Sequence, residues 1–113
     1  MSISATSVVD LGTDPSIRTV GSLRDQLSTA ISQNQSVEIG AEAVTSIDVS
    51  MLQLLASAHR TAQRAGKHIA IRAAPHGPMR DALVRAGFIT SEGVPLTAEG
   101  AFWTFNAAKD QAA

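Results

Sequence analysis

A carboxylate and a hydroxyl stand two positions apart in Asp48-Val49-Ser50, where an apolar segment gives way to a helical pattern. The first N–H groups of a helix have no partner inside the helix, so a polar side chain there is well placed to accept from them. Ser50, with Gln53 three positions later, forms an acceptable capping box, which would stabilise the helix by about 0.5 to 2 kcal/mol. The stretch is therefore either a structural cap or a site at which a hydroxyl is used.

Other patterns that carry chemistry are missing from the sequence. No Gly-x-Ser-x-Gly segment offers a nucleophile elbow, and there are no cysteines. Neither a Walker-type phosphate loop nor Gly-x-Gly-x-x-Gly occurs. His59, His68 and His76 fall on a helix, a strand and a turn, so we expect ordinary solvated or helix-end histidines rather than metal ligands. The sequence thus favours a protein that is not an enzyme and has no metal or cofactor.

Composition limits the kind of molecule and its partners. With 113 residues, 44% of them hydrophobic, the chain suits a single domain over residues 1–113. Nine basic residues against ten acidic ones, without a basic run, leave no electrostatic footprint for nucleic acid. The sequence shows no signal-peptide pattern and no apolar run of about 18 residues. We therefore expect a cytoplasmic protein that does not insert into membranes.

The first third of the sequence predicts a strand and a helix. Apolar residues alternate with mostly polar ones over residues 3–11, the period of a half-buried strand, and residues 12–16 indicate a turn. From Val20 the apolar spacing becomes helical for about 12 residues, with Ser22 and Asp25 approximating a cap near the start. The stripe of this helix comprises Val20, Leu23, Leu27, Ala30 and Ile31.

The middle of the sequence repeats this order. Segments 36–40 and 44–47 lead to Asp48, and the helix that follows ends at a capping Gly66. The apolar run 68–74 is too short for a helix and predicts a buried strand, parallel to the strand before Asp48. The stripe of this second helix comprises Met51, Leu52, Leu55, Ala58, Ala62 and Ala65. Of its cations, we expect Arg60, Arg64 and Lys67 to stay solvated near the negative end of the helix dipole.

A third helix begins at Gly77-Pro78 and ends at Gly87-Phe88. Its apolar stripe comprises Met79, Ala82, Leu83 and Ala86. Beyond it, we prefer a final helix capped by Thr97 and carrying Phe102 and Phe105, although Gly100 and Phe102-Trp103 would also suit a strand. The alternating order predicts right-handed βαβ crossovers, hence an α/β fold with a mostly parallel or mixed sheet of about four strands and helices packed against it.

The junction Ile47-Asp48-Val49-Ser50, followed by Leu52, Leu54 and Leu55, resembles the signature of the STAS domain family. In that signature an apolar strand ends at Asp, one or two hydroxyl residues follow, and a helix begins with closely spaced leucines. The resemblance continues through the helix to Gly66, the strand 69–71 and the segment 78–88, about two thirds of the chain.

The resemblance implies a regulatory switch of the anti-sigma factor antagonist or chemotaxis-associated type. In such antagonists a Ser or Thr just after the Asp is phosphorylated by a histidine-kinase-like serine kinase that also sequesters a sigma factor, and the phosphorylated form loses its grip on that kinase. A PP2C-type phosphatase would be a further partner. Val49 has no hydroxyl, so the resemblance assigns the phosphoacceptor role to Ser50. Met51, Leu52, Leu54 and Leu55 make the following helix apolar on more than one face, so we expect part of Met51 or Leu54 to meet a partner as well. The expected partner-binding residues are Asp48, Val49, Ser50, Met51 and Leu54.

Physical chemistry leaves two outcomes open at this junction. The helix start favours an added dianion of about −1.5 to −2 charge on Ser50, while Asp48 repels it, so phosphorylation would alter a binding surface locally without refolding the domain. Val49 and Met51 replace the small or polar residues common in phosphorylated switches. The alternative is an accessory subunit of an ABC lipid transporter, whose same helix docks on the ATPase without signalling.

Overall fold

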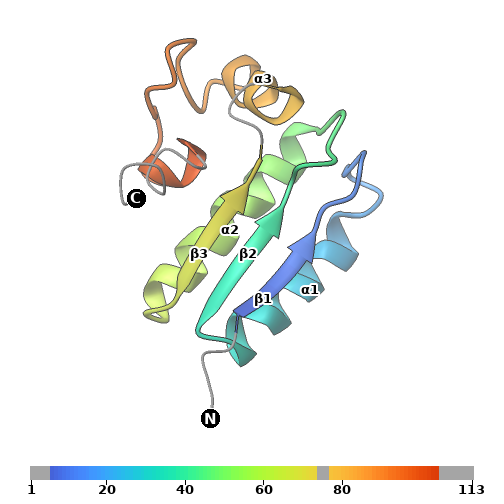
Figure 1. Ribbon diagram of the computed structural model, residues 1–113, viewed down its shortest axis with the longest axis vertical. Coiled ribbons are helices and arrows are strands. Elements are labelled where there is room, and N and C mark those ends of the chain that lie inside the picture. Colours follow the sequence, from blue (N-terminus) through green and yellow to red (C-terminus); the bar gives the residue numbers. More distant parts are fainter. Residues whose placement is uncertain (1–5, 74–76, 105–113) are drawn as a thin grey trace.

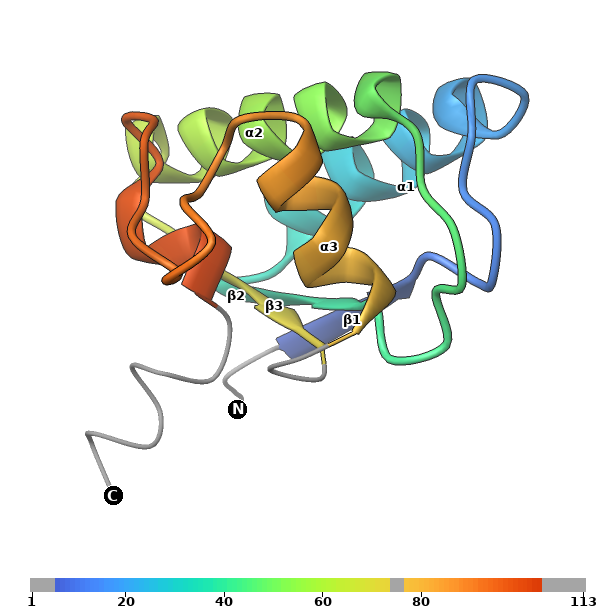
Figure 2. The ribbon, with the colours of Figure 1, turned by 90° about the horizontal axis from the view of Figure 1, so that it is seen from above.

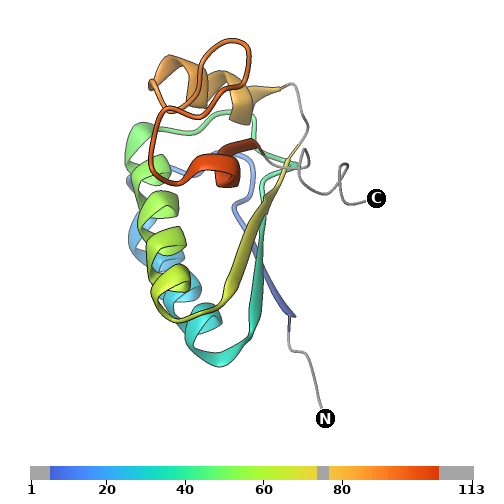
Figure 3. The same ribbon diagram turned by 90° about the vertical axis from the view of Figure 1, so that its left-hand side faces the viewer.

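Strands and helices alternate along the chain in the computed structural model, which describes residues 6–73 and 77–104. The three strands pair in parallel in the order β1-β2-β3. Figure 1 shows this sheet, and Figure 3 shows α1 and α2 together on one of its faces, as two successive right-handed crossovers require. The elements are β1 (Thr6–Asp10), α1 (Val20–Gln33), β2 (Ser36–Gly40), α2 (Val49–Arg64), β3 (His68–Arg72), α3 (Pro78–Arg85) and the 3-10 helix η1 (Gly100–Thr104).

The register of the sheet explains its two faces. Val9, Ile39 and Ile71 are aligned across the three strands and are all buried. Their neighbours one position earlier point to the opposite face, because side chains alternate along a strand. That face carries the exposed Val8 and the half-buried Glu38, which pairs with Arg72 at 3.2 Å. The core therefore lies between the sheet and the layer formed by α1 and α2.

The first helix confirms the apolar stripe but not the expected cap. Its buried residues are Leu23, Leu27, Ala30 and Ile31, and it runs for 14 residues. The N-cap is Thr19, whose side chain makes no capping bond, and its Oγ1 accepts from the N–H of Ser16 at 3.1 Å. The capping arrangement expected from Ser22 and Asp25 is wrong, because both residues already lie inside the helix.

The sheet has three strands in the part of the chain that the structure describes, and a fourth is not found there. Residues 44–47, expected to continue strand structure toward Asp48, form a loop instead. The N–H groups of Thr45 and Ser46 both donate to the carbonyl of Thr13 rather than to a neighbouring strand. The start of the expected N-terminal strand, with Ile3 and Ala5, lies outside the described residues.

Two glycines end helices as the sequence predicts. Gly66 has φ of 71° and lets the N–H of Lys67 reach the carbonyl of Ala62, which closes α2. Gly87, with φ of 83°, does the same for α3, where the N–H of Phe88 donates to the carbonyl of Leu83 at 2.9 Å. Both ends are Schellman motifs.

The segment after α3 turns back and packs beside β3 (Figures 1 and 2). Ile89 and Pro95 form an isolated antiparallel bridge, and the chain then ends its described part in η1. The expected final helix is thus present as a 3-10 turn that buries Phe102 and Trp103. Phe105 and His76 lie outside the described residues. None of the helices described is long and apolar enough to cross a membrane.

Candidate functional site

Two loops meet at the carboxyl end of the parallel sheet, which is where ligand and partner sites of α/β folds commonly lie. The loop after β1 covers residues 11–19 and the loop after β2 covers residues 41–48. The Thr45 N–H donates to the carbonyl of Thr13 at 2.7 Å, and the Ser46 hydroxyl donates to Asp14 Oδ1 at 2.6 Å. These bonds hold the start of α2 against the loop that precedes α1 (Figure 2).

Asp48 is the N-cap of α2. Its backbone is extended, with φ of −98° and ψ of 170°, and its Oδ1 accepts from the N–H of Met51 at 3.2 Å. The same Oδ1 accepts from the Ser50 hydroxyl at 2.6 Å, and Oδ2 accepts from the N–H of Ile17 at 3.0 Å. The hydrogen bond from Ser50, followed by those from the backbone, outweighs desolvation and holds the pKa of Asp48 below its ordinary value. The carboxylate is therefore charged and fully engaged.

The capping box expected between Ser50 and Gln53 is wrong. Because the helix begins at Val49, Ser50 is its second residue, and its hydroxyl donates to Asp48 instead of accepting from a backbone N–H. The capping carboxylate and the hydroxyl thus belong to different residues, two positions apart in sequence and 2.6 Å apart in space. Ser50 is consequently not needed as the N-cap of α2.

The structure separates the expected partner-binding residues into surface and core. Val49 is 50% exposed, and Ser50 and Leu54 are half-buried. Met51 has no exposed surface, so the expectation that part of it meets a partner is corrected: its side chain belongs to the core. Sequence reasoning missed Ile17, which is 65% exposed and donates its N–H to Asp48. No motif marks Ile17, although a turn around Asp14-Pro15 was evident.

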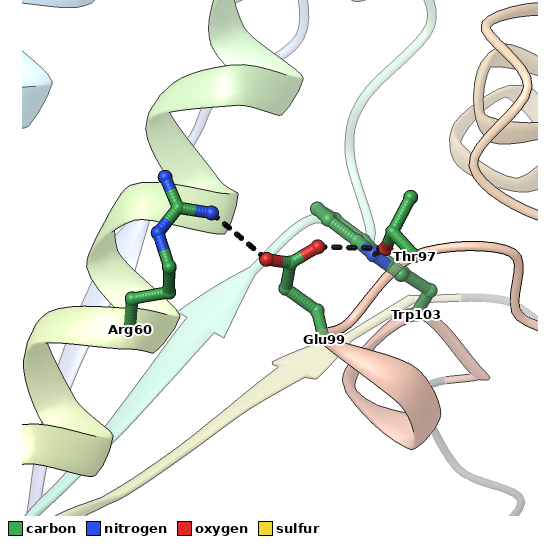
Figure 4. Close-up of polar contacts among 4 residues, drawn as sticks. All are labelled: Arg60, Thr97, Glu99 and Trp103. Atoms are coloured by element: carbon green, nitrogen blue, oxygen red, sulfur yellow. Dashed lines mark hydrogen bonds and ion pairs between the residues drawn. The ribbon is translucent and has the colours of Figure 1, made fainter.

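A second polar cluster joins α2 to the C-terminal segment (Figure 4). Glu99, with a side chain 4% exposed, accepts from Arg60 at 2.9 Å through Oε2 and from the Thr97 hydroxyl at 2.6 Å through Oε1. The indole N–H of Trp103 donates to Thr97 Oγ1 at 2.8 Å. Burial alone would raise the pKa of Glu99, but hydrogen bonds, led by the one from Thr97, outweigh it and lower that pKa.

Three expectations about α2 are corrected by these contacts. His59 is buried rather than solvated, stacks on Phe102 at 4.5 Å, and has an Nδ1 without a hydrogen-bond partner in the described structure. Desolvation lowers the pKa of His59. Arg60 pairs with Glu99, and the Lys67 ammonium donates to the carbonyls of Ile31 and Ser32, so neither stays merely solvated. His68 is exposed at the start of β3, as expected.

The Glu99 and Asp48 clusters differ in the side chains that surround their polar groups. Around Glu99, each oxygen of the carboxylate and both the hydrogen and the oxygen of the Thr97 hydroxyl bind groups of the chain itself, among them the indole of the buried Trp103. Around Asp48, exposed apolar side chains stand beside the polar groups. Within residues 6–73 and 77–104, no three His, Asp or Glu side chains converge as metal ligands would. The start of α2 is therefore the candidate site, and the Glu99 cluster is structural.

Comparisons with known proteins place this geometry in context. A family model described as "Mlab, STAS domain" matches residues 2–94, which include Asp48 and Ser50 but not Glu99. A search of curated proteins found no match. Among solved structures, the anti-sigma factor antagonist SpoIIAA in its unphosphorylated form is similar, with 21% identity and a TM-score of 0.62. The similarity covers 77% of this chain and 76% of that one, and at this identity it shows a shared fold.

Proposed function

The chain belongs to the STAS domain family, and we propose that it is a non-enzymatic protein-binding switch of the anti-sigma factor antagonist type with Ser50 as phosphoacceptor. One observation carries the proposal. The Ser50 hydroxyl lies 2.6 Å from Asp48 Oδ1 at the start of α2, next in sequence to the exposed Val49, and the other oxygen of the same carboxylate binds the N–H of the exposed Ile17. The partner is a serine kinase with a histidine-kinase-type ATPase that also acts as the anti-sigma factor, and a PP2C-type phosphatase reverses the modification.

Phosphorylation would change this surface in a defined way. Ser50 Oγ forms a bond to the γ-phosphorus of ATP as the bond from that phosphorus to ADP breaks, and the hydroxyl proton is released. The group that donated to Asp48 becomes a dianion beside a carboxylate. Two unit charges about 4 Å apart repel by about 1 kcal/mol in water and about 4 kcal/mol at a protein surface. A partner that covers Val49 must also desolvate this dianion, so the phosphorylated form binds it more weakly.

A second candidate function is favoured by the state of the same hydroxyl. Ser50 is already engaged as a donor to Asp48, and Val49 beside it is exposed without any modification. An unmodified start of α2 could therefore serve as a constitutive docking surface. In this candidate the domain is an accessory subunit that docks on the ATPase of an ABC lipid transporter.

Mass spectrometry after incubation with ATP and lysate from the host organism separates the two. We expect one added phosphoryl group on the wild type, located on Ser50 by peptide fragmentation and absent from Ser50→Ala. The matched control is Ser57→Ala, which removes an exposed hydroxyl from the same helix and should leave phosphorylation intact. Absence of phosphate from the wild type, together with co-purification of a transporter ATPase, would favour the docking candidate.

A further inference from the structure

The carboxylate of Asp48 contacts two segments that are distant in sequence. Oδ1 accepts from the Ser50 hydroxyl on α2, and Oδ2 accepts from the N–H of Ile17, 31 positions earlier. We propose that Asp48 is a positioning residue that transmits the state of Ser50 to Ile17, so that Ile17 is a second, phosphorylation-dependent contact for the partner. This inference rests on the proposed function and adds to it a second element of the surface and the route by which the two are coupled.

Asp48 supplies the bond that attaches the turn around Ile17 to α2. The first half of the loop is anchored by the bond from Thr45 to Thr13 and by the bond from Ser46 to Asp14. Ile17 follows this half, inside a turn in which the N–H of Thr19 donates to the carbonyl of Ser16 at 2.9 Å, and its side chain is 65% exposed. The bond from the Ile17 N–H to Asp48 Oδ2 at 3.0 Å joins this turn to α2. Loss of that bond would release the turn, and Ile17 with it, from α2 while leaving the first half of the loop attached.

The two oxygens of Asp48 cannot respond separately, because they belong to one planar group. With an unmodified Ser50, the hydroxyl donates to Oδ1 and favours the present orientation of the carboxylate. A phosphoryl group removes this donor and places a second anion next to Oδ1, so the carboxylate turns away. Rotation about the side-chain bonds that moves Oδ1 also moves Oδ2, and the Ile17 N–H loses its acceptor.

The geometry indicates the chemistry of the partner surface. Val49 and Ile17 are both exposed aliphatic side chains, and each belongs to a segment that Asp48 holds. The partner that fits them is a protein with an apolar contact surface that covers the neutral Ser50 hydroxyl. Phosphorylation then acts twice, since it places a dianion in the contact and displaces one of its two apolar side chains.

NMR spectra of the isolated protein test the coupling without any kinase or partner. In the wild type, the amide resonances of Ile17 and Met51 should both titrate with the Asp48 carboxylate at acid pH, because both N–H groups donate to it. We expect Ser50→Glu to abolish the titration of Ile17, whereas the neutral Ser50→Ala retains it. Asp48→Asn should abolish it as well, and the Thr45 amide, bonded to Thr13, serves as the internal reference. Retention of the Ile17 titration in Ser50→Glu would overturn the inference.

The rate of Ser50 phosphorylation in host lysate with ATP tests the role of Ile17. We expect Ile17→Ser to slow phosphorylation roughly tenfold, the factor that corresponds to one lost apolar side-chain contact. The matched control is Leu96→Ser, which removes another exposed aliphatic side chain, 58% exposed, from the segment after α3 and should leave the rate unchanged. Equal rates for the two variants would overturn the assignment of Ile17. If the wild type acquires no phosphate, the proposed function fails, while the spectra still decide whether Asp48 couples Ser50 to Ile17.

Discussion

Asp48 and Glu99 each accept a hydrogen bond from a nearby hydroxyl at 2.6 Å, yet the two pairs have different surroundings. The hydroxyl of Thr97 accepts from the indole N–H of the buried Trp103, and the second oxygen of Glu99 binds Arg60. The second oxygen of Asp48 binds a loop N–H instead, beside exposed aliphatic side chains. A carboxylate–hydroxyl pair is thus structural where a buried aromatic side chain and an arginine also bind it, and an accessible site where exposed aliphatic side chains lie beside it.

Removal of the buried indole of Trp103 should have the largest effect on stability. Trp103 is fully buried and contacts Phe88 and Phe102 at ring distances of 5.1 and 4.9 Å. We expect Trp103→Ala to reduce the free energy of unfolding by about 3 to 5 kcal/mol, measured by chemical denaturation. Trp103→Phe should cost less, because it keeps an aromatic ring, although it removes part of the indole together with the N–H that donates to Thr97. Similar losses for both variants would mean that the parts of the indole absent from both, which include this N–H, account for most of the stabilisation.

Removal of the buried carboxylate should have the next largest effect. Glu99→Ala leaves the Thr97 hydroxyl without its acceptor and deletes the partner of Arg60. We expect a loss of about 2 kcal/mol in the free energy of unfolding, because the hydrogen bond from the partly buried Thr97 to the buried Glu99 matters more than the Arg60 pair, whose arginine is half exposed. Arg60→Ala is the control and should cost less than 1 kcal/mol by the usual value of such pairs. An equal cost would place the stabilisation in the ion pair.

Acidic pH should lower the free energy of unfolding through protonation of His59. Its pKa is lowered in the folded state by desolvation, so the unfolded chain takes up a proton first as the pH falls below the ordinary value of 6.5. Stability should therefore decrease from pH 6.5 down to the folded-state pKa, by at most about 1.4 kcal/mol per pH unit. Denaturation at several pH values should show this slope in the wild type and not in His59→Phe, which retains a ring against Phe102. The same slope in both proteins would contradict this assignment.

Substitutions of Asp48, at the accessible start of α2, should have the smallest effect on the free energy of unfolding. Asp48→Ala removes the N-cap of α2, and we expect a loss of about 1 kcal/mol in denaturation experiments. Asp48→Asn keeps a side chain that caps nearly as well and should stay within about 0.5 kcal/mol of the wild type. If Asp48→Ala proved more costly than Glu99→Ala, the contrast between an accessible and a structural carboxylate would be lost.

Local patterns predicted the framework of the fold. The helical stripes gave α1, α2 and α3, and the two Schellman glycines, Gly66 and Gly87, end helices as expected. The predicted cap of α2, Ser50, lies two residues after the observed cap, Asp48, since both are good capping types and only the extended backbone at 48 decides between them. The burial of His59 could be predicted from the sequence, because it follows Leu55 by four positions on the buried face of α2.

Other features had no local signal. Glu99 meets Arg60 across 39 positions and Ile17 meets Asp48 across 31, so each contact depends on the packing of the whole fold. Residues 44–47 contain β-branched residues suited to a strand, but Gly40 ends β2 and the loop bonds to Thr13 instead. These long-range bonds determine that the C-terminal half of α2 packs against the segment around Glu99, whereas its start lies beside the exposed Ile17.

The length of α2 has an electrostatic consequence for the two ends. Asp48 and Arg60 lie about 18 Å apart along its axis, at about 1.5 Å per residue. This separation is about twice the Debye length at physiological ionic strength, which is about 8 Å. The field of a charge added at Ser50 is therefore largely screened by salt before it reaches the half-exposed Arg60, so the ion pair at the far end of α2 should respond little to it.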